Sequence, residues 1–77
     1  MKSSMTKKDV ISLMMTDVTD LTDGNFLVKE ASDDGGSHIE IQLEEHDDSS
    51  KVRKFMDKNY PAQRIIIMNV PQGYLND

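Results

Sequence analysis

Cysteine is absent from this chain of 77 residues, and so are long apolar runs. Without cysteine the chain forms neither a disulfide framework nor a Cys-based zinc site, which excludes knottins, zinc ribbons and thiol enzymes. The longest apolar runs, Val10–Met15 with Ser12 inside it and Ile65–Met68, are far shorter than the roughly 20 residues of a membrane-spanning helix. Asp9 interrupts the basic residues before the first run and no small-residue cleavage site follows, so a secretory signal fits poorly. We therefore expect a cytoplasmic protein.

Basic residues are in the minority, because 9 Lys and Arg stand against 14 Asp and Glu and give a net charge of −5. Such a chain disfavours nonspecific binding to phosphate backbones, although a local basic patch can still form. The composition, 36% hydrophobic and 30% charged, lies near the globular range, and the length allows one small domain over 1–77. We expect flexible tails at 1–5 and 71–77. A core this small leaves only a few kcal/mol of net stability, so association with another chain would help.

Capping residues and apolar spacing predict two helices. Thr6 is a suitable N-cap with Asp9 three positions later, and apolar residues then recur at spacings of three and four until Asp23-Gly24. The second helix begins at Asp47–Ser49, where carboxylates suit the unpaired amides of a helix start, and it ends before Pro61. The helical residues expected in the core are Val10, Leu13, Met14, Val18, Val52, Phe55 and Met56.

Three strands are predicted from the remaining apolar segments. Asn25–Ala31 is followed by the turn residues Asp33–Ser37, which favour a hairpin. The partner His38–Glu44 alternates strictly between polar and apolar residues, so one of its faces is wet. Gln63–Val70 is apolar on both faces and reads as a covered strand. The strand residues expected in the core are Phe26, Val28, Ile39, Ile41, Leu43, Ile66 and Met68.

The element order α-β-β-α-β predicts an α+β, two-layer domain with a three-stranded sheet and both helices on one face. Two strand orders are possible. We favour 2-1-3, a mainly antiparallel sheet, because the order 1-2-3 would place the polar strand His38–Glu44 at the centre of a mixed sheet.

No metal or cofactor site is predicted. Thr19–Glu30 has the central glycine and final glutamate of an EF-hand loop, but Leu21 and the leading threonine replace two of its carboxylate ligands. His38, Glu40 and His46 could face one divalent metal, yet they lack the Cys pair of zinc deaminases, and no HExxH motif occurs. Polar residues on a solvated strand face are the simpler interpretation.

No catalytic residues are predicted either, and we do not expect an enzyme. The serines fall in caps and turns, and the histidines lack a recognisable context such as a Gly-x-Ser-x-Gly elbow. Gly35-Gly36 precedes a strand and not a helix, so this pair cannot place a helix terminus against a phosphate.

Two charged surfaces indicate alternative functions. Lys51, Lys54 and Lys58 form a basic stripe on the second helix with Arg53 beside it, as a nucleic-acid-binding module would. No exposed aromatic or glycine pattern supports RNA recognition, and a solvated helix face explains the stripe equally simply. An acidic band could mimic nucleic acid toward a basic protein, or could keep the hairpin from pairing with other edges. The band consists of Asp33, Asp34, Glu40, Glu44, Glu45, Asp47 and Asp48.

The main prediction is a protein–protein interaction module, of an accessory or inhibitor type, that self-associates. Two short helices cover one sheet face, so Leu27, Ile65 and Ile67 are expected on the other face together with an exposed final strand. A homodimer would use such a patch twice about a two-fold axis. In the alternative, Tyr74 and Leu75 fold back and cover the patch within one chain.

Overall fold

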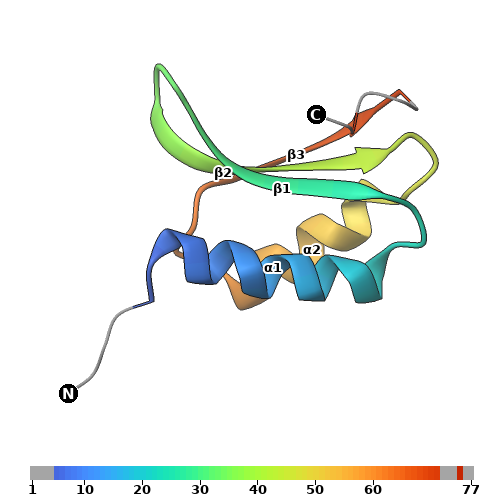
Figure 1. The fold of residues 1–77 in the computed structure, drawn as a ribbon, viewed down its shortest axis with the longest axis horizontal. Coiled ribbons are helices and arrows are strands. Elements are labelled where there is room, and N and C mark those ends of the chain that lie inside the picture. Colours follow the sequence, from blue (N-terminus) through green and yellow to red (C-terminus); the bar gives the residue numbers. More distant parts are fainter. Residues whose placement is uncertain (1–4, 72–74, 76–77) are drawn as a thin grey trace.

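The computed structural model describes residues 5–71 and 75, and this part of the chain folds into five elements. Both helices lie on the same side of a three-stranded sheet (Figure 1). The α+β architecture with the order α-β-β-α-β is therefore confirmed. The elements are α1 (Lys7–Leu21), β1 (Phe26–Asp33), β2 (Gly36–Glu44), α2 (Ser49–Asn59) and β3 (Ile65–Val70).

Helix α1 begins with a complete capping box. The Thr6 side chain accepts the backbone N–H of Asp9 at 3.1 Å, and the Asp9 carboxylate accepts that of Thr6 at 3.2 Å. The helix buries Val10, Met14 and Val18, but Leu13 is 48% exposed, so its expected core position is wrong. Consecutive helical residues are about 100° apart, and a single sheet covers too narrow a stripe to include both Leu13 and Met14.

Helix α2 begins at its own N-cap, Asp48, whose carboxylate accepts the backbone N–H groups of Ser50 at 2.9 Å and Lys51 at 3.3 Å. Val52 and Met56 of α2 are fully buried against the sheet, and Phe55 packs partly buried beside them. The Tyr60 hydroxyl, just after α2, donates to Asp17 Oδ2 on α1 at 2.5 Å. This bond links the C-terminal end of α2 to α1.

The strand order is β1-β2-β3, with β2 antiparallel to β1 and parallel to β3. The expected order 2-1-3 is therefore wrong. Ile39, Ile41 and Leu43 of β2 have no exposed surface, and these residues occupy the centre of the helix-covered face. With β2 in the middle, its apolar face lies at the centre of the core. Its polar face can remain solvated in this position, because both helices pack on the other side of the sheet.

Strand β3 has the opposite parity to the one expected. Ile65 pairs with Ile39 and Ile67 with Ile41, so both side chains lie on the helix-covered face, and Ile65 is only 8% exposed. Ile66 and Met68 lie on the face without helices, called the open face below, and not in the core. A run of four consecutive apolar residues carries no alternation that could fix its register.

The β1–β2 hairpin is tighter than expected, with only Asp34 and Gly35 between the strands. Gly36 follows with a φ of 111°, a conformation that favours glycine. The Arg64 guanidinium donates to Asp33 Oδ1 at 3.0 Å and to the Gly36 carbonyl at 3.2 Å, which anchors the start of β3 to the hairpin. The hydrogen bond from Arg64, together with the Gly35 N–H, lowers the pKa of Asp33.

The tails expected at 1–5 and 71–77 fall mostly on 1–4, 72–74 and 76–77, which lie outside the described residues. The suggested cover by Tyr74 falls there too. Neither α1 nor α2, the helices of the described part, has the length and apolar character needed to cross a membrane.

Candidate interaction site between α2 and β3

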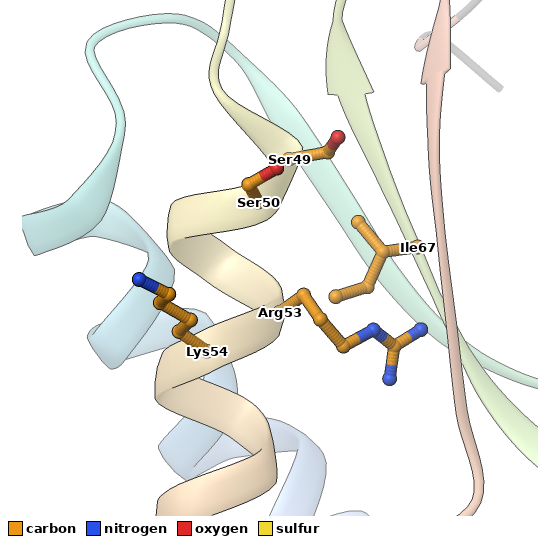
Figure 2. Close-up of a pocket in the computed structure, with 5 residues that line it drawn as sticks. All are labelled: Ser49, Ser50, Arg53, Lys54 and Ile67. Atoms are coloured by element: carbon orange, nitrogen blue, oxygen red, sulfur yellow. The ribbon is translucent and has the colours of Figure 1, made fainter.

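A groove of about 340 Å³ lies between the first turns of α2 and the outer strand β3. Helix α2 contributes Ser49, Ser50, Arg53 and Lys54, and β3 contributes Ile67. In Figure 2 the Ile67 side chain points from the strand toward the helix, Arg53 extends toward β3, and Lys54 leaves the other flank of α2. The groove thus combines an apolar wall with hydroxyl groups and two cations.

Arg53 is held at the strand by two contacts. Its Nη2 donates to the Ile65 carbonyl at 3.0 Å, and its Nη1 lies 3.4 Å from the Asp57 carboxylate one helical turn later. Asp57 is 66% exposed, so this second contact is a solvent-screened surface ion pair. Lys54 is exposed and forms no ion pair within 5–71. Of the two cations that line the groove, Arg53 therefore stands beside the outer strand, whereas the Lys54 ammonium lies on the other flank of α2 (Figure 2).

Among the described strands, none pairs with the outer edge of β3. The Ile39 N–H donates to the Arg64 carbonyl at 2.9 Å, which sets the phase of the parallel ladder with β2. In such a ladder alternate residues turn both backbone groups toward the neighbouring strand, so Ile65, Ile67 and Asn69 turn theirs away from β2. The bond from Arg53 to the Ile65 carbonyl agrees with this phase. Ile67 therefore places its side chain in the groove and its N–H and C=O at the free edge.

An apolar strip borders this edge on the open face. It consists of the half-buried residues Ile66, Met68 and Val70. Its neighbours on β2 are polar, because Ile66 pairs with Glu40 and Met68 with Gln42. The strip is therefore one strand wide, and the exposed apolar surface is smaller than the sequence predicts.

The predicted partner-binding residues do not lie together. Leu27 is on the open face as expected, where it pairs with Gln42, but β2 separates it from β3 by about 10 Å. Ile65 belongs to the core and Ile67 packs partly buried against it. The final strand does lie at an edge of the sheet, as the predicted surface requires. On its open face, however, the residues are Ile66 and Met68, and not Ile65 and Ile67.

The basic stripe is divided in two. Lys51, Lys54 and Lys58 are exposed on α2, whereas Arg53 is half-buried and bonded to β3. Nucleic-acid binding by these residues stays a prediction.

The acidic band is also divided. Asp33 and Asp34 stand at the hairpin end of β2, and Glu40 lies in the middle of this strand. The other members, at the far end of β2, are Glu44, Glu45, Asp47 and Asp48. Nine residues of strand separate these ends by about 26 Å. Asp33 is paired with Arg64 and Asp48 caps α2, so both carboxylates already serve the fold.

A second cluster, which sequence patterns did not indicate, lies at the far end of β2. The Asp47 side chain is 8% exposed and its Oδ2 has no hydrogen-bond partner in the described part of the chain. A Cβ built on Gly24 would stand 2.8 Å from this oxygen and 2.8 Å from Glu44 Oε1, so glycine makes room for both carboxylates. His46 Nδ1 lies 3.5 Å from Glu44 Oε1, and its Nε2 lies 3.8 Å from Asp47 Oδ1.

The histidines do not share a site. His38, 5% exposed, stands near the hairpin with Nδ1 3.9 Å from Asp33 Oδ2, whereas His46 follows the opposite end of β2. Over the described ranges 5–71 and 75, no group of three or more His, Cys, Asp or Glu residues is arranged to hold a metal ion.

Comparison of the chain with protein-family models, with curated proteins and with solved structures finds no match. The function is therefore inferred from the geometry of this chain.

Proposed function

We propose that this chain is a non-catalytic protein–protein interaction module that binds a partner strand along the free edge of β3. The observation that carries the proposal is the difference between the two edges of the sheet. Edge strands that remain unpaired usually carry charges or proline, which block pairing with other chains. Strand β1 carries Lys29, Glu30 and Asp33, whereas β3 has no charged residue and no proline between Ile65 and Val70.

The side chains beside this edge support the same function. Ile67 faces the groove on one side of β3, and the strip of Ile66, Met68 and Val70 lies on the other. An added strand would bury apolar surface on both faces of the sheet while its backbone satisfied the outward groups of β3. Main-chain hydrogen bonds would supply affinity, and the two apolar surfaces would supply specificity.

The groove does not favour catalysis. The hydroxyl groups of Ser49 and Ser50 stand beside Arg53 and Lys54. The described residues that line the groove include no histidine and no carboxylate that could act as a general base toward a serine nucleophile.

The sequence predicts that the partner strand comes from a second copy of the same chain. Two copies could pair their β3 strands antiparallel about a two-fold axis at Ile67, which would set Ile66 of one copy against Met68 of the other. The measurement is light scattering behind a sizing column at tens of micromolar protein. A dimer that becomes monomeric in Met68→Lys would support this form, and a monomeric wild type would contradict it.

The edge itself is tested by photocrosslinking. A crosslinking amino acid placed at position 68, next to the free edge, should trap a partner strand in a lysate from the native cell. The matched control places the same amino acid at position 27, on the open face of β1. Products at 68 and not at 27 are expected, whereas equal products at both positions, or products at 27 alone, would contradict the proposal.

A further inference from the structure

The charge of the groove differs from that of the molecule. Helix α2 carries four basic residues and one acidic residue, although the chain as a whole has a net charge of −5. Two of these basic residues, Arg53 and Lys54, line the groove next to the outward backbone groups of Ile67. A strand that pairs with β3 must pass the Arg53 guanidinium.

We infer that the partner strand is an extended peptide of another protein with an acidic side chain between two apolar ones, and that Arg53 selects the acidic side chain while Lys54 adds positive charge at the rim of the groove. This inference rests on the proposed function, since it requires the edge of β3 to be the binding surface. It adds the chemistry of the ligand and the residues that recognise it.

The alternation of a strand fixes which peptide side chain enters the groove. Paired residues of neighbouring strands project to the same face of a sheet. A peptide residue opposite Ile67 therefore projects to the helix-covered side, into the groove. The residues before and after it project to the open face, where they flank the strip that contains Ile66 and Met68. The peptide consequently needs a central residue that suits the groove and two neighbours that suit an apolar strip.

An acidic central residue suits the groove best. Arg53 is fixed at the edge by the Ile65 carbonyl, and its only ion-pair partner in the described part of the chain, Asp57, is largely solvated. A carboxylate entering between α2 and β3 would therefore meet a positioned guanidinium, and the Ser49 and Ser50 hydroxyls could donate to it. A basic residue would be repelled by Arg53, and an apolar residue would gain no charged hydrogen bond from it.

A second copy of the chain does not supply this carboxylate. The segment from Arg64 to Pro71 contains no acidic residue. Two-fold pairing of β3 would also bring two α2 helices together, each with Arg53 on the facing side, and like charges oppose such an approach. A free phosphate is disfavoured as well, because the Asp48 carboxylate already accepts the first-turn amides of Ser50 and Lys51.

The inference is tested by selecting peptides on the full chain. The probe is a phage-displayed library of nonapeptides with three randomised central positions in a threonine-rich background. We expect enrichment of the pattern apolar–acidic–apolar. In titrations with the selected peptide at 0.15 M salt, replacing the central acidic residue by its amide should weaken binding about tenfold, as expected for a lost charged hydrogen bond.

Charge reversal at the groove provides the matched comparison. Lys54→Glu should weaken binding of the acidic peptide and strengthen binding of a version with a central lysine. Lys58→Glu makes the same change of charge on the same helix, but Lys58 does not line the groove, so it should change both affinities less than Lys54→Glu does. Lys54 and Lys58 are exposed, so neither variant removes a contact of the core.

Four other outcomes would overturn the inference. If selected peptides shift the amide resonances of 65–69 without any acidic preference, the edge binds strands but Arg53 does not select them. If the peptides bind elsewhere, the proposed function fails together with the inference. If the β3 resonances change with protein concentration alone, a second copy occupies the edge. If a single-stranded oligonucleotide binds and Lys54→Glu and Lys58→Glu weaken it equally, the basic stripe is a nucleic-acid surface.

Discussion

Gly36 occupies a backbone position where the side chain matters only through its effect on φ. A Cβ built there meets no atom within 4 Å, yet the φ of 111° is one that L-residues rarely adopt. Gly36→Ala should therefore destabilise the fold by about 1–2 kcal/mol through backbone strain alone. Urea unfolding followed by circular dichroism measures this change. An unchanged unfolding midpoint would mean that the hairpin relaxes without strain.

Tyr60 titrates abnormally because of its surroundings. Burial, followed by the hydrogen bond to Asp17, raises the pKa of Tyr60 to about 12. The folded state thus holds the hydroxyl proton more tightly than the unfolded chain, whose tyrosine pKa is about 10. The contribution to stability is complete below pH 10 and is lost as the pH rises through 12.

The corresponding experiment compares the wild type with Tyr60→Phe. The free energy of unfolding of the wild type should fall more steeply between pH 10 and 12 than that of the variant. The two proteins share every other ionisable group, so the difference between their curves reports on Tyr60. Parallel curves for the two proteins would show that the Tyr60–Asp17 bond does not link the helices in solution.

At the scale of elements, the start of α2 connects stability to the groove. Removing the cap with Asp48→Ala should cost about 1 kcal/mol of stability, because the amides of Ser50 and Lys51 lose their acceptor. The first turn of α2 also carries two groove residues, so peptide binding should weaken as well. Chemical denaturation and peptide titration measure the two effects.

The control for this variant is Asp20→Ala, an equal change of charge at an exposed position in the last turn of α1. It should change the stability by less than about 0.5 kcal/mol. Equal losses in both variants would attribute the effect to net charge and not to the cap.

Local patterns were sufficient to predict the elements but not their arrangement. The caps at Thr6 and Asp48 and the alternation of β2 are fixed by residues within a few positions of each other, and all of them appear in the structure. The strand order depends instead on which apolar face most needs to be covered. In β3 the parity was undetermined, because Ile65, Ile66 and Ile67 are identical side chains on alternating faces.

The groove could not be predicted from the sequence for a related reason. Its wall consists of an α2 turn and Ile67, which stand 13 or more positions apart. Arg53 appeared to belong with the lysines of the same helix, because helical spacing alone cannot show that a long side chain turns toward a neighbouring strand. Only the parallel pairing of β2 with β3 places these residues side by side.

For the molecule as a whole, the two edges of the sheet have opposite characters. The β1 edge is charged and ends at a hairpin pinned by Arg64, and the β3 edge is apolar in side chain and open in backbone. Asp33 and Asp34 lie at the hairpin end of β2, away from the cationic groove, whereas Asp48 and Asp57 lie close to it. Under the proposed function, Arg53 would attract a negatively charged, extended ligand to the β3 edge.

The parallel pairing of β3 also has a consequence for the order in which the chain assembles. Hairpin partners are between 3 and 17 positions apart, whereas every β3 residue pairs with a β2 residue 26 positions earlier. Closing the longer loop costs about 1 kcal/mol more in chain entropy than closing a loop of ten residues. This difference favours formation of the hairpin before β3 joins the sheet. A ligand that bound this edge would recognise only the completed fold, so its binding energy would hold the last strand in place.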